Sequence, residues 1–165
     1  MIIIEGADCT GKTTLAKRIC EEVGGQYFHC SYHPKWNVEA YHRLIGHTAG
    51  KLEEQAGVPT VIDRFAMSEA AYGLVYRNGP SYDTAALMQE MIKAYKPTFI
   101  FCRTESAAED HKRIQQTRSE MFDDITEVVN VFDELASSGK YGVNILYDYK
   151  KHDTDYFIKA FASYA

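Results

Sequence analysis

Eight residues near the start of the chain combine glycine, lysine and hydroxyl side chains at a fixed spacing. They read GADCTGKT, from Gly6 to Thr13, and match the pattern G-x-x-x-x-G-K-[ST]. In this pattern Gly6 and Gly11 let the backbone turn tightly, so that its N–H groups point inward around a phosphate. Lys12 adds a positive charge, and Thr13 adds a hydroxyl that can ligate Mg²⁺. The spacing therefore predicts a site for a nucleoside triphosphate.

The residues on both sides of this loop fit the same interpretation. The apolar run Ile2 to Ile4 is typical of a short buried strand at the centre of a parallel sheet. Residues 14–19 continue as a helix, whose positive N-terminal end would face the same phosphate. The predicted ATP-binding residues are Gly6, Ala7, Asp8, Cys9, Thr10, Gly11, Lys12, Thr13 and Thr14.

A second charged pair, Asp63 and Arg64, stands at the carboxyl end of the predicted strand VPTVID, residues 58–63. Ligands of parallel α/β sheets bind beyond the carboxyl ends of the strands, so this pair is expected to face the ligand. An acidic residue there can hold Mg²⁺ through water, and the planar fork of an arginine can bridge two phosphates. The alternative is a simple salt bridge at the edge of the sheet.

Further cations lie downstream, where Arg113 and Arg118 stand on either side of a predicted helix break. This arrangement is typical of a mobile lid, here about residues 104–119, that brings positive charge onto a transferring phosphoryl group. Arg103 and Lys112 are candidates for the same role. An ordinary solvated helix face is the alternative.

Strand and helix patterns alternate along the whole chain. The predicted strands span residues 2–4, 26–32, 58–63, 98–102 and 143–147, and the predicted helices span 14–19, 38–52, 66–76, 87–95, 121–135 and 156–164. The patterns SAAE at 106–109 and TRSE at 117–120 fit the capping box that begins a helix. We therefore expect a single α/β domain over residues 1–165, with three α/β/α layers, a five-stranded parallel sheet and a short helical lid.

Composition and net charge indicate which partners the protein binds and where in the cell it works. Of the 165 residues 45% are hydrophobic and 25% charged, which is ordinary for a globular enzyme. The net charge of −5 argues against a protein that works on nucleic acid, because such proteins usually carry a basic face. The four cysteines have no C-x-x-C spacing, and the chain has no signal peptide or long apolar run. We expect a cytoplasmic protein with small-molecule nucleotide partners and no membrane association.

Together, the motifs resemble the thymidylate kinase family of nucleoside monophosphate kinases, and more closely its short phage-encoded forms. The stretches that carry the resemblance are EGADCTGKTT, DRFAMSEAAYG, RIQQTRSE and FDELA. The family loop E-G-x-D-G-x-G-K-T-T is matched at Glu5, Gly6, Asp8, Gly11, Lys12, Thr13 and Thr14. The family motif D-R-[YF]-x-x-S-x-x-A-Y is matched at Asp63, Arg64, Phe65, Ser68, Ala71 and Tyr72.

The resemblance implies a role for each matched position. Lys12 and the loop N–H groups would hold the β- and γ-phosphates of ATP, and Thr13 and Asp63 would hold Mg²⁺. Asp8 would accept a hydrogen bond from the 3′-hydroxyl of the acceptor sugar. Arg64 would clamp the phosphate of the acceptor. ATP and Mg²⁺ are therefore the implied cofactors.

The resemblance also implies an acceptor site and a catalytic lid. Tyr72 would pack near the acceptor sugar with support from Phe65, and Ser68 belongs to the same predicted site. Arg113 or Arg118 would close over the transferring group. The predicted catalytic residues are thus Lys12, Arg64, Arg113 and Arg118.

The sequence departs from the family pattern at several points. Cys9 stands where the family has glycine or a basic residue, and Gly73 replaces the glutamine that usually follows A-Y. The Glu-Pro expected after the second strand is absent, and residues 31–36 occupy that stretch. Tyr32, His33 and Trp36 in this stretch could build a pocket for the base by aromatic stacking, or Trp36 could staple a helix to the sheet.

The predicted reaction is transfer of the γ-phosphoryl group of Mg-ATP to a 5′-deoxynucleoside monophosphate, a pyrimidine such as dTMP or a modified dUMP. If the protein is phage-encoded, it would act in the host cytoplasm, and it could form a homodimer. One alternative is a deoxynucleoside kinase, with Asp63 or Glu39 as the base that a hydroxyl acceptor needs. Others are a kinase of a hydroxymethylated base in DNA and a nucleotide-binding switch, although the guanine-reading N-K-x-D is absent from the sequence.

Overall fold

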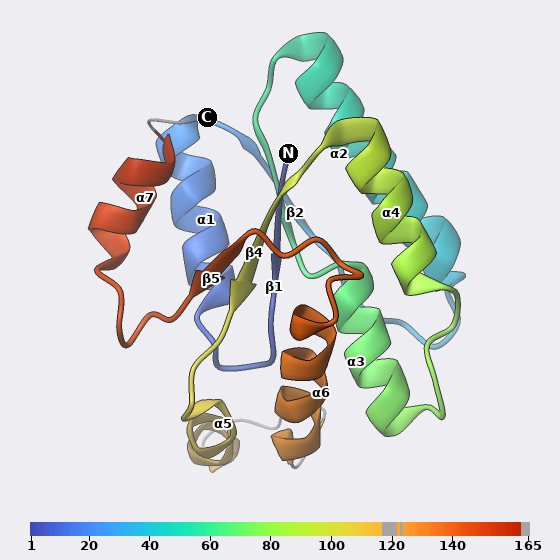
Figure 1. The fold of residues 1–165 in the computed structure, drawn as a ribbon, viewed down its shortest axis with the longest axis vertical. Helices are drawn as coiled ribbons and strands as arrows, with labels where there is room; N and C mark the ends of the chain where they lie inside the picture. The colour runs from blue at the N-terminus through green and yellow to red at the C-terminus, as the bar shows by residue number, and fades with distance from the viewer. Residues whose placement is uncertain (117–121, 123, 163–165) are drawn as a thin grey trace.

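The core of the protein is a parallel sheet of five strands in the order β2-β3-β1-β4-β5 (Figure 1). A computed structural model of the protein describes residues 1–116, 122 and 124–162. The strands are β1 Ile2–Glu5, β2 Gln26–His29, β3 Thr60–Asp63, β4 Thr98–Cys102 and β5 Ile145–Tyr147. The described helices are α1 Lys12–Val23, α2 Val38–Ala56, α3 Ala66–Tyr76, α4 Thr84–Tyr95, α5 Ala107–Gln115, α6 Thr126–Ser137 and α7 Thr154–Ala162.

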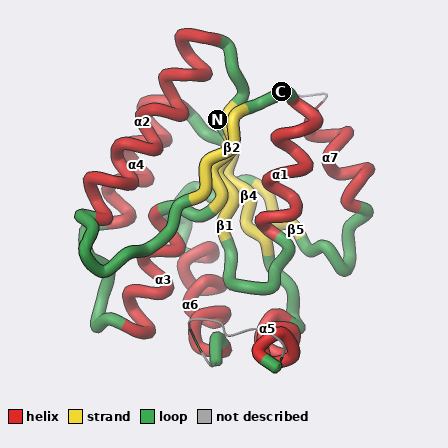
Figure 2. The backbone as a smooth tube through the Cα atoms, turned by 180° about the vertical axis from the view of Figure 1, so that it is seen from behind, coloured by secondary structure: helices red, strands yellow, loops and turns green. Residues whose placement is uncertain are grey.

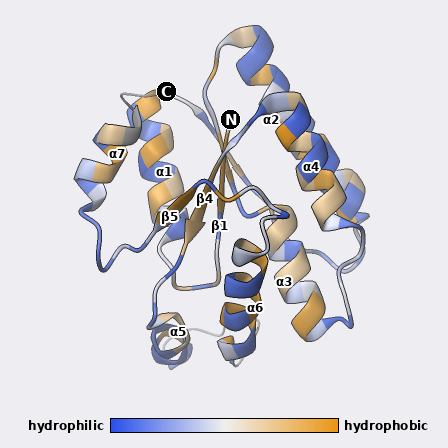
Figure 3. Ribbon diagram, in the orientation of Figure 1, coloured by the Kyte–Doolittle hydropathy of each residue, from blue (hydrophilic) through white to orange (hydrophobic). Residues whose placement is uncertain are grey.

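Alternation of side chains along β1 produces the three layers. Ile2 and Ile4 pack toward α1 and α7, whereas Ile3 packs into the cluster that includes α2, α3, α4 and α6. Figures 1 and 2 show these two groups of helices on opposite sides of the sheet. Hydrophobic colour follows the central strands in Figure 3. The three-layer α/β/α fold and the central position of β1 confirm the prediction from the sequence.

Several predicted boundaries were wrong by a few residues. β3 begins at Thr60 rather than at residue 58, because Pro59 has no N–H to donate to a neighbouring strand. β2 ends at His29 rather than at residue 32, since its partner β3 ends at Asp63. Strand ends therefore depend on the neighbouring strand as well as on local sequence.

The two predicted capping boxes have different outcomes. Ser106 precedes α5 as predicted, but its hydroxyl donates to Asp110 Oδ2 at 2.7 Å and makes no capping bond. The capping box at this position was therefore a wrong prediction. The second pattern, at 117–120, lies outside the described residues.

Helix α2 is continuous and longer than predicted, and two glycines let it lie close to α4. A Cβ at Gly46 would stand 2.8 Å from the sulfur of Met91, and one at Gly50 would stand 2.5 Å from the ring of Tyr95. Most apolar side chains of α3 and α4 are buried in the core. A homodimer remains a prediction.

Glu5 connects the end of β1 to the start of α3. Its buried carboxylate accepts hydrogen bonds from the backbone N–H groups of Phe65 at 2.9 Å, Met67 at 2.9 Å and Ser68 at 3.2 Å, and from the Ser68 hydroxyl. Burial raises the pKa of Glu5 to about 7, although the bonds from Ser68 and the charge of Arg64 act in the opposite direction. The contacts fix the turn that carries Arg64.

The raised pKa of Glu5 gives the stability of the fold a pH dependence. The folded state holds a proton on Glu5 between its ordinary pKa of 4.5 and about 7, whereas the unfolded state releases it. The free energy of unfolding should therefore fall as the pH rises through this range, by about 3 kcal/mol for this group. Denaturant unfolding of the wild type and of Glu5→Gln, compared over this range, checks the prediction. A difference between the two proteins that stays constant with pH would contradict it.

Candidate active site

The loop between β1 and α1 has the tight geometry that its glycines predict. Gly6 has φ 148°, and a Cβ there would lie 2.2 Å from the carbonyl oxygen of Cys102. Gly11 has φ 77° and lies against the ring of Tyr149. Cys9 adopts φ 62°, the left-handed conformation that glycine takes easily. Cys9, which stands where the family pattern has glycine or a basic residue, therefore keeps a glycine-like backbone conformation.

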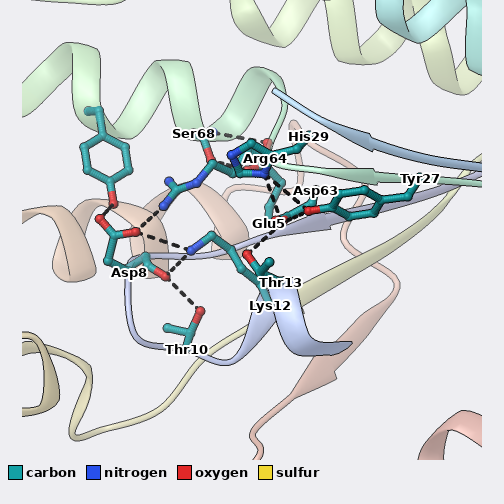
Figure 4. A network of polar contacts seen from close by, with 12 residues as sticks. Glu5, Asp8, Thr10, Lys12, Thr13, Tyr27, His29, Asp63, Arg64 and Ser68 are labelled. Carbon is teal, nitrogen blue, oxygen red and sulfur yellow. Dashed lines mark hydrogen bonds and ion pairs between the residues drawn. The ribbon is translucent and has the colours of Figure 1, made fainter. Parts of the chain in front are cut away.

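Lys12 places a buried positive charge inside this loop. Its Nζ donates to the carbonyl oxygen of Ala7 at 2.8 Å and lies 3.6 Å from Asp8 Oδ1 (Figure 4). Burial and the nearby charge of Arg64 lower the pKa of Lys12 to about 8, while Asp8 and Asp63 act against that shift. A cation held inside a loop of this shape fits a bound phosphate.

Thr13 and Asp63 form a pair suited to Mg²⁺. The Thr13 hydroxyl donates to Asp63 Oδ2 at 2.7 Å, and the other carboxylate oxygen, Oδ1, is buried with no hydrogen-bond partner among the described residues. One hydroxyl and one carboxylate, supplemented by water and nucleotide phosphates, are the usual ligands of Mg²⁺ at such sites. The described residues contain no cluster of three or more His, Cys, Asp or Glu side chains that could hold a metal by itself.

Two residues that the sequence analysis did not assign to the site also contact Asp63. The Tyr27 hydroxyl donates to Asp63 Oδ2 at 2.8 Å, and His29 Nδ1 lies 3.1 Å from the same oxygen (Figure 4). Burial acts to raise the pKa of Asp63, but the hydrogen bonds from His29, Thr13 and Tyr27 lower it. The sequence did hold a sign of this contact. Side chains alternate along β2, so those of Tyr27 and His29 share one face, and parallel pairing sets His29 opposite Asp63.

Arg64, Asp8 and Tyr72 form a second polar group next to Lys12. Arg64 has φ 67°, and its guanidinium pairs with Asp8 Oδ1 and lies 5.5 Å from the centroid of the Tyr72 ring. The Tyr72 hydroxyl donates to Asp8 Oδ2 at 2.8 Å. Although burial would raise the pKa of Asp8, the charges of Arg64 and Lys12 lower it to about 2. Asp8 is therefore ionised and a weak base.

A cavity of about 260 Å³ opens beside this group. Its wall includes all but one of the predicted substrate-binding residues, namely Asp8, Arg64, Phe65, Ser68 and Tyr72. The remaining one, Trp36, lines a separate hollow with Tyr41 and Leu44. Trp36 is 50% exposed, and its ring stacks on His33 with centroids 5.1 Å apart. The structure thus does not bring Trp36 to the cavity.

The same cavity has an aromatic and charged section, of which the sequence indicated only Tyr32. The Arg77 guanidinium lies 4.0 Å from the centroid of the Tyr32 ring and donates to Glu69 Oε2 at 2.6 Å. Glu69 is buried and also accepts from the backbone N–H and hydroxyl of Ser81. His42 adds an uncharged ring, because burial lowers its pKa to about 4. Flat, hydrogen-bonding side chains of this kind suit a planar base.

Helix α5 belongs to the predicted lid and presents a different residue from the one expected. The Arg113 side chain is 74% exposed and pairs with Asp110 Oδ1 at 3.3 Å. Arg118 lies outside the described residues. The alternative cations form surface pairs, Lys112 with Asp124 and Arg103 with Asp133. The residue of α5 that lines the cavity is His111.

The described part of the chain contains no helix that is both long and apolar enough to cross a membrane.

Comparison with known proteins identifies the fold. The sequence matches no protein-family model and no curated protein. Among solved structures, the YorR protein from Bacillus subtilis in complex with phosphorylated GDP is similar, with a TM-score of 0.67 and 19% identity over 99% of this chain and 94% of that chain.

Two further solved structures have named activities. The deoxyadenosine kinase from M. mycoides with bound dCTP gives a TM-score of 0.59 and 16% identity over 99% of this chain and 98% of that chain. The thymidylate kinase from Ehrlichia chaffeensis gives a TM-score of 0.50 and 11% identity over 99% of this chain and 96% of that chain. The protein therefore has the fold of the P-loop nucleotide and nucleoside kinases.

Proposed function

We propose that the protein transfers the γ-phosphoryl group of Mg-ATP to a 5′-deoxynucleoside monophosphate, a pyrimidine such as dTMP or a modified dUMP. It would be a thymidylate kinase-like enzyme of the short phage type, acting in the cytoplasm, which is the host cytoplasm if a phage encodes it. The observation that carries the proposal is the position of Arg64. Its guanidinium lies in the wall between the phosphate-binding loop and the cavity, next to Lys12.

In this proposal the donor nucleotide binds at the loop. The loop N–H groups and Lys12 hold the β- and γ-phosphates, and Lys12 exchanges the Ala7 carbonyl for a phosphate oxygen. Thr13 and Asp63 hold Mg²⁺, which neutralises phosphate charge when it is bound. Lys12 then stabilises the charge that develops on the transferring group, because it is already in place and shielded from water.

The acceptor binds in the cavity, with its phosphate on Arg64. The guanidinium fork binds a phosphate with two hydrogen bonds, and Asp8 and Tyr72 hold the arginine side chain in position. Asp8 is also available to the sugar hydroxyl. The base would lie against Tyr32 and Arg77 in the aromatic section of the cavity.

The charges in the site favour a monophosphate over a hydroxyl acceptor. A hydroxyl group needs a base to take its proton, whereas a monophosphate already offers an ionised oxygen. Asp8, with its pKa lowered to about 2, is a weak base. Asp63 accepts three hydrogen bonds, and Glu39 pairs with Arg43 at 3.0 Å. Glu69, in the cavity wall, pairs with Arg77 and accepts two hydrogen bonds from Ser81. These carboxylates are therefore poorly suited to deprotonate a hydroxyl.

A panel of acceptors tests the proposal. ADP release from Mg-ATP would be measured with the common and 5-hydroxymethylated deoxynucleoside monophosphates, the matching nucleosides, and duplex DNA containing the modified base. We expect stimulation by one or two pyrimidine monophosphates. Stimulation only by nucleosides would support a deoxynucleoside kinase, and stimulation only by DNA would support a kinase of the modified base. ADP release that no acceptor changes would support a switch.

A further inference from the structure

A tyrosine in the loop between β5 and α7 packs against the phosphate-binding loop. Gly11, the residue before Lys12, is the N-cap of α1. A Cβ at Gly11 would stand 3.1 Å from Cδ1 of the Tyr149 ring, so the ring occupies the space beside the glycine. The path of the backbone at an N-cap sets the direction of the first N–H groups of the helix, and these are the groups that bind a phosphate. Tyr149 therefore lies beside the part of the loop that would hold phosphate.

Two further contacts hold Tyr149 in this position. Its hydroxyl donates to Oδ2 of Asp110, a residue of helix α5, at 3.2 Å. The turn that carries the tyrosine is closed by Asp148, whose Oδ1 accepts from the backbone N–H of Lys150 at 3.0 Å. The Tyr149 side chain is itself 37% exposed, so its burial adds less to the stability of the fold than that of a core tyrosine.

Asp110 is a firm anchor, because several groups share its carboxylate. Its Oδ2 also accepts from the Ser106 hydroxyl and from Lys150 Nζ, both at 2.7 Å, and its Oδ1 pairs with Arg113 at 3.3 Å. Asp110 is 9% exposed, and the hydrogen bonds from Lys150 and Ser106 lower its pKa. The carboxylate is therefore ionised, and both α5 and the loop after β5 fix its position.

We propose that Tyr149 is a positioning residue for the donor nucleotide, and that Asp110 holds it against Gly11. The ring keeps the loop backbone on the path in which its N–H groups face the phosphates, so that the ligand does not have to order the loop. The inference rests on the proposed function in one respect, because it takes the loop to be the site of Mg-ATP. Helix α5 then supports the donor site as well as the acceptor cavity, which His111 lines.

Binding of Mg-ATP, measured by calorimetry without an acceptor, tests this role. We expect Tyr149→Ala to raise the Kd for Mg-ATP by about tenfold or more, because the loop loses its support, with a Tm close to that of the wild type. Tyr149→Phe keeps the ring and loses only the bond to Asp110, so its Kd should rise by about threefold. Tyr156→Ala, which removes a 75% exposed tyrosine of α7, should match the wild type.

A double substitution tests whether Asp110 acts through the tyrosine. Asp110→Ala also releases Lys150 and Arg113, so the informative comparison is the effect of Tyr149→Phe in the presence and in the absence of the carboxylate. We expect Tyr149→Phe to raise the Kd in the wild type and to leave it unchanged in Asp110→Ala. An equal effect in both backgrounds would overturn the role of Asp110.

The outcomes separate the inference from the proposed function. An unchanged Kd in Tyr149→Ala, with or without a lower Tm, would refute the inference and leave the proposed function in place. If Tyr149→Ala fails to fold, wild-type affinity of Tyr149→Phe would refute it instead. A raised Kd in a wild-type background that responds to no monophosphate would support the inference and contradict the proposed function. A wild type that does not bind Mg-ATP would contradict both.

Discussion

Lys12→Ala will lower kcat by about 10²- to 10³-fold and leave the fold intact. A preformed positive group directed at developing charge is worth about this much in enzymes. Lys12 is the buried cation inside the loop, and its Nζ contacts only loop oxygens, at Ala7 and Asp8, among its described partners. Its removal leaves Asp8 paired with Arg64, so no buried carboxylate loses its only counter-charge. Steady-state turnover and thermal unfolding, measured on the same preparation, check the prediction.

A neighbouring lysine provides the matched control for this substitution. Lys17 is exposed on the same helix, α1, and Lys17→Ala should keep wild-type turnover. Normal turnover of Lys12→Ala would show that the loop does not hold the transferring phosphate. A large drop in Tm would instead show that the main effect of Lys12 is on stability.

Arg64→Ala will lower kcat/KM for the acceptor by about 10²- to 10³-fold, with a much smaller change in KM for ATP. The guanidinium lies in the cavity wall, and it is held by Asp8 and by the face of Tyr72. Arg64→Lys should recover little activity, because a lysine cannot reproduce the planar two-bond contact with a phosphate. Acceptor titrations at saturating ATP, and ATP titrations at saturating acceptor, separate the two effects.

Arg18 supplies the control for the arginine substitution. It forms an exposed ion pair with Asp155 of α7 and does not line the cavity, so Arg18→Ala should leave both kinetic constants unchanged. An Arg64→Ala enzyme with near-normal turnover would remove Arg64 from the mechanism. A loss seen equally in the KM for ATP would place Arg64 at the donor instead.

The order of strands and helices was predictable, because each element carries its own periodic pattern. The β1 run IIIE and its loop were recognisable since strand, glycines and lysine are adjacent in the sequence. Asp63 and Arg64 were recognisable for the same reason, as charges at the carboxyl end of an apolar strand. Local sequence thus predicted the phosphate-binding side of the candidate site.

The cavity was much harder to predict, because residues far apart in the sequence form it. The stacking of Arg77 on Tyr32 depends on how the end of α3 packs beside the loop after β2. The exclusion of Trp36 depends on the path of that loop. Sequence position alone did not indicate which residues of these segments meet.

Local sequence likewise did not indicate which side of helix α5 faces the cavity. A charged residue in a predicted lid was expected to face the site, but the burial of the helix turns His111 inward and Arg113 outward. Charge identifies a candidate for phosphate contact, whereas the packing of the helix decides which residue reaches the cavity.

Following the transferred group tests the central claim most directly. ATP labelled with ¹⁸O in its γ-phosphoryl group would be incubated with the protein, Mg²⁺ and the acceptor that stimulates ADP release, and the products would be analysed by mass spectrometry. The account predicts a deoxynucleoside diphosphate that carries the label on its terminal phosphate. Label recovered only in inorganic phosphate, or on a nucleoside hydroxyl, would contradict it.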